Sequence, residues 1–147
     1  MNLNAIVNDP TQQTWRSFTI DEANRSLVLV KRITSDLVEA HSRMLDLHES
    51  AEAAAEADAG QVDGMYRELR GVVDKLHGYL KELEEVGVEL EEMSLGIVDF
   101  PAMSGGREVR LCWQLGQETV QYWHDVGATA ATRRPVESMP VPVGAGR

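Results

Sequence analysis

Residues 112–125, CWQLGQETVQYWHD, gather the side chains of this chain that are best suited to chemistry. They include the only cysteine, Cys112, and the adjacent pair His124 and Asp125. A thiolate beside an imidazole can act as a nucleophile, and the same two groups can hold a divalent metal ion. This segment is therefore the first candidate for a metal-binding or hydrolytic site.

Two arguments weigh against such a site. The expected pairing of the two strands in this segment sets Leu111 opposite His124 and Cys112 opposite Trp123, so that Cys112 and His124 face opposite sides of the sheet. A structural zinc site also favours four nitrogen or sulfur ligands, more than the segment supplies. We therefore favour Cys112 as a small buried side chain and His124 as a hydrogen-bonding group at a strand end. This interpretation needs no cofactor, and a divalent metal held by Cys112 and His124 is the alternative.

Three arginines near this segment, Arg110, Arg133 and Arg134, could bind a phosphate or the carboxylate of a partner. With Trp123 and Asp125 they form the candidate binding set, and Trp123 could stack on a base of single-stranded nucleic acid. In the simpler interpretation, Arg110 pairs with Asp125 or stacks on Trp123. The sequence has no glycine-rich phosphate loop, no Ser-His-Asp order and no paired-carboxylate motif, so no catalytic residue is assigned.

The elements that would position these residues are short strands. Apolar and polar residues alternate in REVRLCWQL and in TVQYWHD, which predicts two strands joined by a loop at residues 116–119. GIVDFPA supplies a third strand that ends at Pro101. We expect an antiparallel meander over residues 96–125, which is too thin to be stable without a second layer.

Two long helices precede the strands. Thr19 and Glu22 have the spacing of a capping box, which starts a helix over residues 20–57. Apolar residues repeat every three and four positions over residues 62–86, and Gly87 is placed to end that second helix. The short connection predicts an antiparallel hairpin that supports the sheet.

The expected fold class is α+β: a long antiparallel helical hairpin packed with a small three-stranded antiparallel β-meander. At 147 residues the chain is the size of one domain, which we place at residues 18–135. Residues 1–17 read as a loose N-terminal segment. Residues 136–147 read as a disordered tail, because prolines and glycines recur there without a period.

The charge distribution limits the classes of partner. The formal net charge is −10, and the first 95 residues carry 9 Lys and Arg against 19 Asp and Glu. Such acidity disfavours non-specific binding to nucleic acid and to anionic membranes. No apolar run of about 18 residues and no signal peptide is readable, so we expect a cytoplasmic location and no membrane partner.

The apolar stripe of the second helix is wider than one partner helix requires, because Val73 and Leu80 flank the seven-residue repeat. We expect self-association through the helices into a homodimer. In the absence of a catalytic set, the favoured function is a non-enzymatic protein-interaction or regulatory module whose protein partner is unknown. The alternatives are a metal-binding or hydrolytic protein that uses Cys112, His124 and Asp125, and a nucleic-acid binder that uses the arginines of the sheet.

Several strings of residues resemble one known family. FTIDEAN, GVELEE, GIVDFPA, GREVRLCWQLGQ, YWHD and RRPV are similar to the family called domain of unknown function 2203, over about residues 18–135. The resemblance implies a small bacterial or archaeal protein in the cytoplasm with no assigned biochemical role, so it carries over no catalytic residue. After the His-Asp pair the family tends towards a Gly-Phe-Ala-Gly-Arg run, and this chain has GATAATRR instead.

Overall fold

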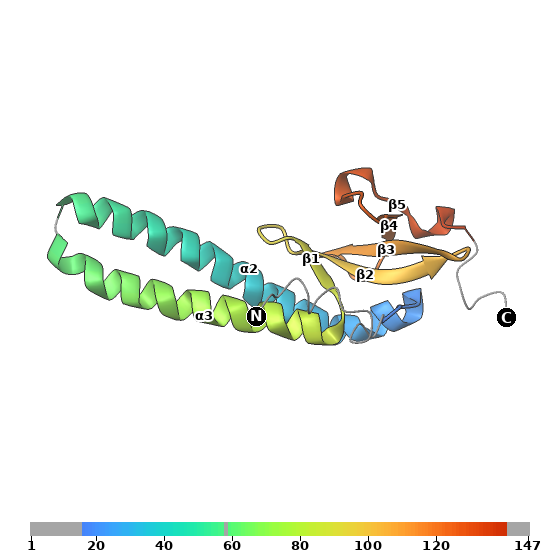
Figure 1. The fold of residues 1–147 in the computed structure, drawn as a ribbon, viewed down its shortest axis with the longest axis horizontal. Helices are drawn as coiled ribbons and strands as arrows, with labels where there is room; N and C mark the ends of the chain where they lie inside the picture. Colours follow the sequence, from blue (N-terminus) through green and yellow to red (C-terminus); the bar gives the residue numbers. More distant parts are fainter. Residues whose placement is uncertain (1–15, 58, 141–147) are drawn as a thin grey trace, which may run out of the picture.

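The computed structural model describes residues 16–57 and 59–140. A helical hairpin of α2 (Ile20–Ala57) and α3 (Val62–Val86) runs the length of the molecule, and the short 3₁₀ helix η1 (Ala59–Gln61) joins the two. The sheet lies over the end of the hairpin where α2 begins and α3 ends, and the other end projects beyond the sheet (Figure 1). The predicted pair of packed helices is confirmed.

The helix ends follow the signals in the sequence. The Glu22 N–H donates to Thr19 Oγ1 at 3.1 Å and the Thr19 N–H donates to Glu22 Oε1 at 2.9 Å, which is the reciprocal pair of a capping box. Gly87 ends α3 with a φ of 99°, a left-handed conformation that glycine adopts without strain. None of the helices in the described residues is both long and apolar enough to cross a membrane.

The sheet has five antiparallel strands in the order β1-β2-β3-β4-β5. They are β1 (Glu89–Glu92), β2 (Ile97–Ser104), β3 (Arg107–Gln114), β4 (Tyr122–Asp125) and β5 (Arg134–Pro135), with the 3₁₀ helices η2 (Ala130–Thr132) and η3 (Val136–Ser138) on either side of β5. The prediction of three strands covers β2, β3 and β4 and misses both edge strands. The reason is local: the sequence of β1, ELEE, resembles the acidic helix end before it, and β5 has two residues, one of them proline.

The register between β3 and β4 differs by one residue from the predicted pairing. Leu111 lies opposite Trp123, and Cys112 lies opposite Tyr122. The connection is longer than a four-residue loop, because the Val120 N–H turns to Asn24 Oδ1 of α2 at 2.7 Å and β4 begins only at Tyr122. A one-residue change of register moves every side chain of a strand to the other face. Cys112 and His124 therefore share a face, and the prediction that they point to opposite faces is wrong.

One face of the sheet packs on the hairpin and forms the core. The side chains on this face are apolar and buried, and they include Val98, Phe100, Ala102, Val109, Leu111, Trp113 and Trp123. They meet the apolar side of α2, which contributes Leu27, Val30, Ile33 and Leu37, and that of α3, which contributes Leu76 and Leu83. The meander thus rests on the helices, as its thinness requires.

The opposite face of the sheet is covered by the chain that follows β4. The first part of this segment, residues 126–132, curls over the side of the sheet that faces away from the helices (Figure 1), and the Ala130 N–H there donates to Glu91 Oε1. The last part joins the core side instead: Val136 and Met139 are partly buried against the core, and Ser104 Oγ, on the same side of β2 as Ala102, donates to the Pro140 carbonyl oxygen at 2.7 Å. Residues 136–140 were assigned to a disordered tail, so that boundary is wrong by several residues, because a sequence rich in proline and glycine gives no sign of these contacts. Residues 1–15 and 141–147 lie outside the described residues.

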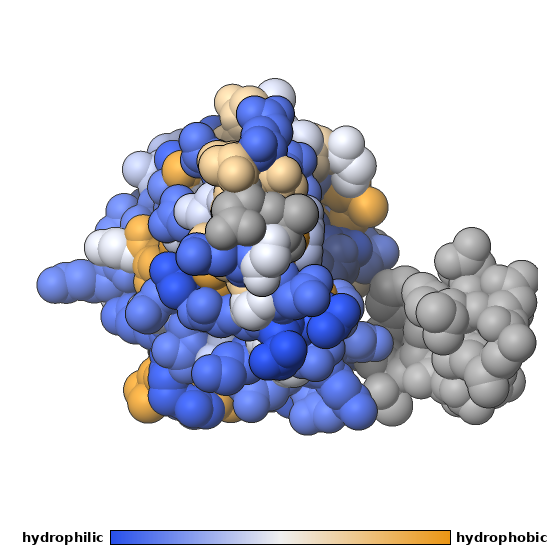
Figure 2. Space-filling view, turned by 90° about the vertical axis from the view of Figure 1, so that its left-hand side faces the viewer, coloured by the Kyte–Doolittle hydropathy of each residue, from blue (hydrophilic) through white to orange (hydrophobic). Residues whose placement is uncertain are grey.

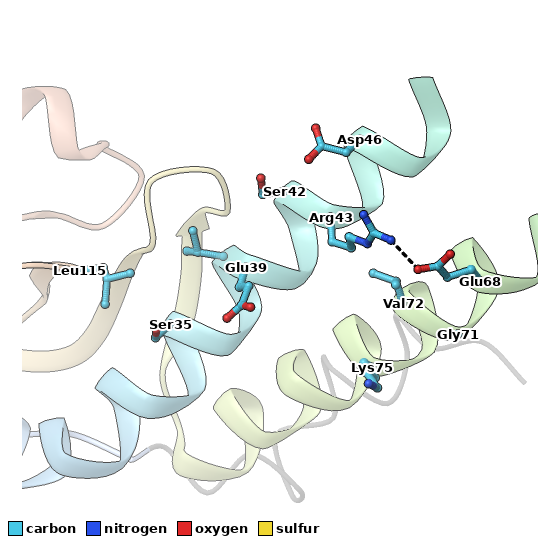
Figure 3. A pocket seen from close by; sticks show the side chains of 11 residues that line it. Ser35, Glu39, Ser42, Arg43, Asp46, Glu68, Gly71, Val72, Lys75 and Leu115 are labelled. Carbon is cyan, nitrogen blue, oxygen red and sulfur yellow. Dashed lines mark hydrogen bonds and ion pairs between the residues drawn. The ribbon is translucent and has the colours of Figure 1, made fainter. Parts of the chain in front are cut away.

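The projecting end of the hairpin presents a mostly hydrophilic surface, on which apolar residues form separate small spots (Figure 2). A groove of about 940 Å³ lies between α2, α3 and the Leu115 side chain, where the hairpin leaves the sheet (Figure 3). An ion pair between Arg43 and Glu68 crosses it. None of the chemically active side chains of the sheet lines this groove.

Candidate metal centre

Four side chains that can bind a metal ion meet on the covered face of the sheet. Each comes from a different strand: Glu91 from β1, Asp99 from β2, Cys112 from β3 and His124 from β4. One ligand atom from each side chain lies within 4.8 Å of those of the other three. Asp99 and Cys112 lie directly opposite each other across β2 and β3, which explains their proximity.

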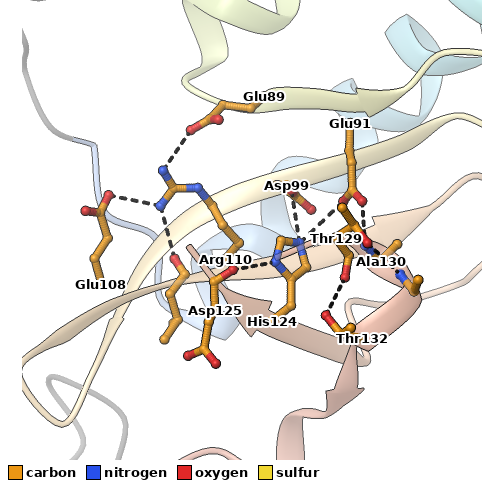
Figure 4. A network of polar contacts seen from close by, with 12 residues as sticks. Glu89, Glu91, Asp99, Glu108, Arg110, His124, Asp125, Thr129, Ala130 and Thr132 are labelled. Atoms are coloured by element: carbon orange, nitrogen blue, oxygen red, sulfur yellow. Dashed lines mark hydrogen bonds and ion pairs between the residues drawn. The ribbon is translucent and has the colours of Figure 1, made fainter. Parts of the chain in front are cut away.

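A β-bulge places Glu91. Leu90 lies opposite Val98 and Glu92 lies opposite Ile97, so Glu91 has no partner residue in β2. A bulge of this kind bends its strand and redirects a side chain. The carboxylate of Glu91 thereby comes within 3.3 Å of His124, measured from Oε2 to Nε2 (Figure 4).

The imidazole of His124 is held in one orientation by the backbone. Its Nδ1 donates to the carbonyl oxygen of Asp125 at 2.9 Å, and because a carbonyl can only accept, Nδ1 carries the proton. Nε2 faces Asp99 Oδ2 at 3.1 Å (Figure 4). Fixing the tautomer through the remote nitrogen in this way is typical of a metal-binding histidine, which then offers Nε2 to the ion.

The cluster is short of hydrogen-bond donors. Asp99 Oδ1 and Glu91 Oε2 are buried, and neither accepts a hydrogen bond from the part of the chain that the structure describes. The Asp99 side chain is only 10% exposed, the His124 side chain 2% and the Glu91 side chain 18%. Burying a carboxylate oxygen without a donor or a cation costs several kcal/mol, so these oxygens call for a positive charge.

The pKa values of the cluster also indicate that its negative charges need a nearby cation. Burial raises the pKa of Asp99 to about 6, and burial together with the Asp99 and Glu91 carboxylates raises the pKa of Cys112 to about 12. Burial alone would lower the pKa of His124, but the Asp125 carbonyl and the carboxylates of Asp99 and Glu91 outweigh it and raise that pKa. Without a metal ion, all three groups therefore hold protons more firmly than in water.

The donor set fits a transition metal of the zinc type. Tetrahedral Zn²⁺ with bonds of about 2.0–2.3 Å sets its ligand atoms about 3.3–3.8 Å apart, which is close to the contacts of 3.1 and 3.3 Å at His124 Nε2. Thiolate and imidazole favour Zn²⁺, Fe²⁺ or Co²⁺, whereas Mg²⁺ and Ca²⁺ prefer sites built from oxygen alone. Elsewhere in residues 16–57 and 59–140, no other histidine, cysteine and carboxylate side chains gather three or more ligand atoms in this way.

Comparison with known proteins places the chain in a family. The model of the family described as "Uncharacterized conserved protein (DUF2203)" matches residues 16–136. The chain belongs to this family. The resemblance seen in the sequence is thus confirmed, and the matched range of this DUF2203 protein includes all four residues of the cluster. No curated protein and no solved structure matches the chain.

In this DUF2203 protein the two predicted metal ligands, Cys112 and His124, lie together in the cluster. The side chain of Asp125, the third residue of the predicted metal-binding or hydrolytic site, is not part of it. The Asp125 carboxylate pairs instead with Arg107 at 2.9 Å and with Arg134 at 3.0 Å. Asp125 contributes to the cluster only through its backbone carbonyl, which holds the imidazole. A Cys-His-Asp arrangement in the order that the sequence offers is therefore not formed by the side chains.

The predicted binding residues are engaged within the chain. Arg110 forms ion pairs with Glu89 at 3.2 Å and Glu108 at 2.9 Å, so neither the predicted pair with Asp125 nor the stacking on Trp123 is formed. Trp123 is buried at 1% exposure, with the Arg134 guanidinium 4.1 Å above its ring. Arg133 lies 4.8 Å above another ring, that of Tyr122. A buried indole has no free face for a nucleic-acid base.

Sequence reasoning missed Asp99 and Glu91. Asp99 carries a usable signal, since it is the only charged residue in the strand IVDFPAMS, and a lone carboxylate in a buried strand needs a partner. Glu91 gives no such signal, because it is one of three glutamates in ELEE and only the bulge distinguishes it from its neighbours.

Proposed function

We propose that this protein binds one divalent transition-metal ion, with Zn²⁺ as the best fit, through Glu91, Asp99, Cys112 and His124. The observation that carries the proposal is the buried Asp99 carboxylate, whose Oδ1 has no hydrogen-bond partner among the described residues and which lies beside an imidazole and a thiol that can both ligate the ion. A cation would satisfy this oxygen and offset the repulsion between the two carboxylates.

The proposed ion would join four strands. Each ligand comes from a different strand, so one ion cross-links β1 to β4 in the layer that faces away from the helices. Glu91 extends the link further, because its Oε1 accepts the N–H of Ala130 at the start of η2. Four protein ligands complete a tetrahedral shell, which is the arrangement of sites whose metal stabilises the fold.

Self-association through the helices remains a second proposal, and with it a role as a protein-interaction module. The observation in its favour is the exposure of two apolar side chains of α2, Val28 at 85% and Leu45 at 52%. These side chains are isolated, so this support is weaker than the support for the metal site. A symmetric helix-to-helix contact would cover them.

The test is native mass spectrometry of protein prepared without an affinity-metal resin, then exposed to Zn²⁺ and exchanged into a metal-free volatile buffer. We expect one zinc ion per chain in the wild type and none in Asp99→Asn or His124→Ala. Glu92→Gln is the matched control, because this neighbouring glutamate is exposed and its hydrogen bonds within the described residues are with Ser94, and it should keep the zinc. A wild type that retains no zinc, or variants that retain it fully, would refute the proposal.

A further inference from the structure

We infer that Glu91 is the exchangeable ligand of the site, and that a small carboxylate from solution can take its place on the metal. The inference rests on the proposed function and adds a ligand-binding position to it.

The other three ligands are fixed by the sheet. Asp99, Cys112 and His124 stand on β2, β3 and β4, each of which is paired with a strand on both sides. The His124 ring is held further by its bond to the Asp125 carbonyl. These three residues are also buried, at 7%, 1% and 2% exposure for Asp99, Cys112 and His124, so none of their side chains can turn into solvent without displacing the atoms packed around it.

Glu91 is fixed much less firmly. It stands on β1, an edge strand, at the bulge where no residue of β2 faces it. The Glu91 side chain is 18% exposed, more than the side chains of Asp99, at 10%, and His124, at 2%. A rotation about its own side-chain bonds can therefore take the carboxylate out of the cluster without disturbing any backbone pairing.

The group that holds Glu91 inward defines the class of the incoming ligand. Glu91 Oε2 faces His124 Nε2, and Oε1 accepts the Ala130 N–H (Figure 4). When Glu91 turns outward, the metal and this N–H are left side by side without a partner. A carboxylate is the ligand that restores both contacts, with one oxygen on the ion and the other on the N–H.

The surroundings of this position suit a small anion from solution. Ala130 begins η2, and its neighbours Thr129 and Ala131 are exposed. The guanidinium of Arg133 lies over the Tyr122 ring on the same side of the sheet, and its Nη1 is 3.4 Å from Gln114 Oε1. A ligand can therefore approach from the side of residues 127–132, with a positive charge nearby.

The experiment loads the full chain with Co²⁺, whose visible spectrum reports its ligands, and titrates sodium acetate at fixed pH and ionic strength. We expect acetate to change the wild-type spectrum in a saturable way. In Glu91→Ala the protein should still bind one Co²⁺, and acetate should bind about tenfold more tightly, because the tethered glutamate no longer competes. Glu92→Ala is the control and should titrate as the wild type does.

Each other outcome contradicts the inference in a distinct way. If Glu91→Ala loses Co²⁺ altogether, Glu91 is an obligatory ligand. If acetate changes only the variant, the position exists but Glu91 does not exchange from it, and if acetate changes neither protein, the position does not accept a carboxylate. If the wild type binds no Co²⁺, the proposed function itself fails, which separates the two claims.

Discussion

The substitution Asp99→Asn should stabilise the metal-free protein and abolish its response to zinc. Burial raises the pKa of Asp99 from 3.8 to about 6, so its ionised form is less stable in the fold than in the unfolded chain. At pH 8 this corresponds to about 3 kcal/mol of lost stability, which asparagine would recover in part because it is neutral and has nearly the same shape. His124 loses a carboxylate partner in the variant, so we expect a net gain of about 1–3 kcal/mol.

The gain should depend on pH with a definite sign. A carboxyl whose pKa is raised in the folded state contributes stability below its unfolded value, and the contribution is lost as pH rises through the folded value. The two proteins should therefore be nearly equal at pH 4 and diverge between about pH 4 and pH 6, the unfolded and folded pKa values of Asp99. Above pH 7 the difference should level off.

The assay is thermal unfolding at pH 4, 6 and 8, with a chelator and, at pH 8, with zinc. The gain at pH 8 amounts to roughly 3–12 °C in the chelator, since about 3–4 °C accompany each kcal/mol for a chain of this size. Zinc at a thousandfold excess over its Kd adds about 4 kcal/mol to the wild type alone, which exceeds the gain of the variant, so the order of the two proteins should reverse. A variant that melts below the wild type in the chelator at pH 8, or that responds to zinc equally, would refute the reasoning. Asp125→Asn removes a carboxylate outside the cluster and should leave the zinc response unchanged.

Four further predictions concern the same site and the helices. Zinc binding at pH 7 should release at least one proton, because Asp99, Cys112 and His124 all have raised pKa values. Calorimetry in buffers of different ionisation enthalpy measures the number of protons released, and a value of zero would contradict the prediction. Cys112→Ser should weaken zinc binding at least tenfold while changing the metal-free stability by less than about 1 kcal/mol, as followed by competition with a chromogenic chelator. Removal of zinc should speed hydrogen exchange at the Ala130 amide more than in β3, and equal rates would show that Glu91 does not couple η2 to the metal. If the helices form a homodimer, light scattering should give twice 16.3 kDa for the wild type and a single chain for Val28→Glu combined with Leu45→Glu; a wild-type monomer would remove that proposal.

The helical part of the fold could be read from the sequence because its signals are local. The capping residues Thr19 and Glu22 and the terminal Gly87 lie within a few positions of the helix ends that they define. Amphipathic spacing then fixes the buried side of each helix without any knowledge of distant residues. The strands β2, β3 and β4 were found for the same reason, since alternation is also a local pattern.

The pairing of the strands could not be read in this way, because it depends on contacts between distant residues. The register of β3 and β4 follows from where β4 begins, and that depends on the bond between the Val120 N–H and Asn24, 96 positions away. An error of one residue in this pairing changed the conclusion about the site, since it separated Cys112 from His124.

The proposed metal site could not be read from the sequence for a related reason. Its ligands stand at positions 91, 99, 112 and 124, one on each of four strands, so no short motif joins them. Zinc motifs are recognised when two ligands are only a few residues apart on one turn, and such pairs form early and locally. Here the ligands meet only after four strands have paired in register and β1 has bulged. The proposed ion would then bind the completed sheet rather than start its folding, so zinc would stabilise the finished layer, and Glu91, the one proposed ligand on an edge strand, would be the ligand able to exchange.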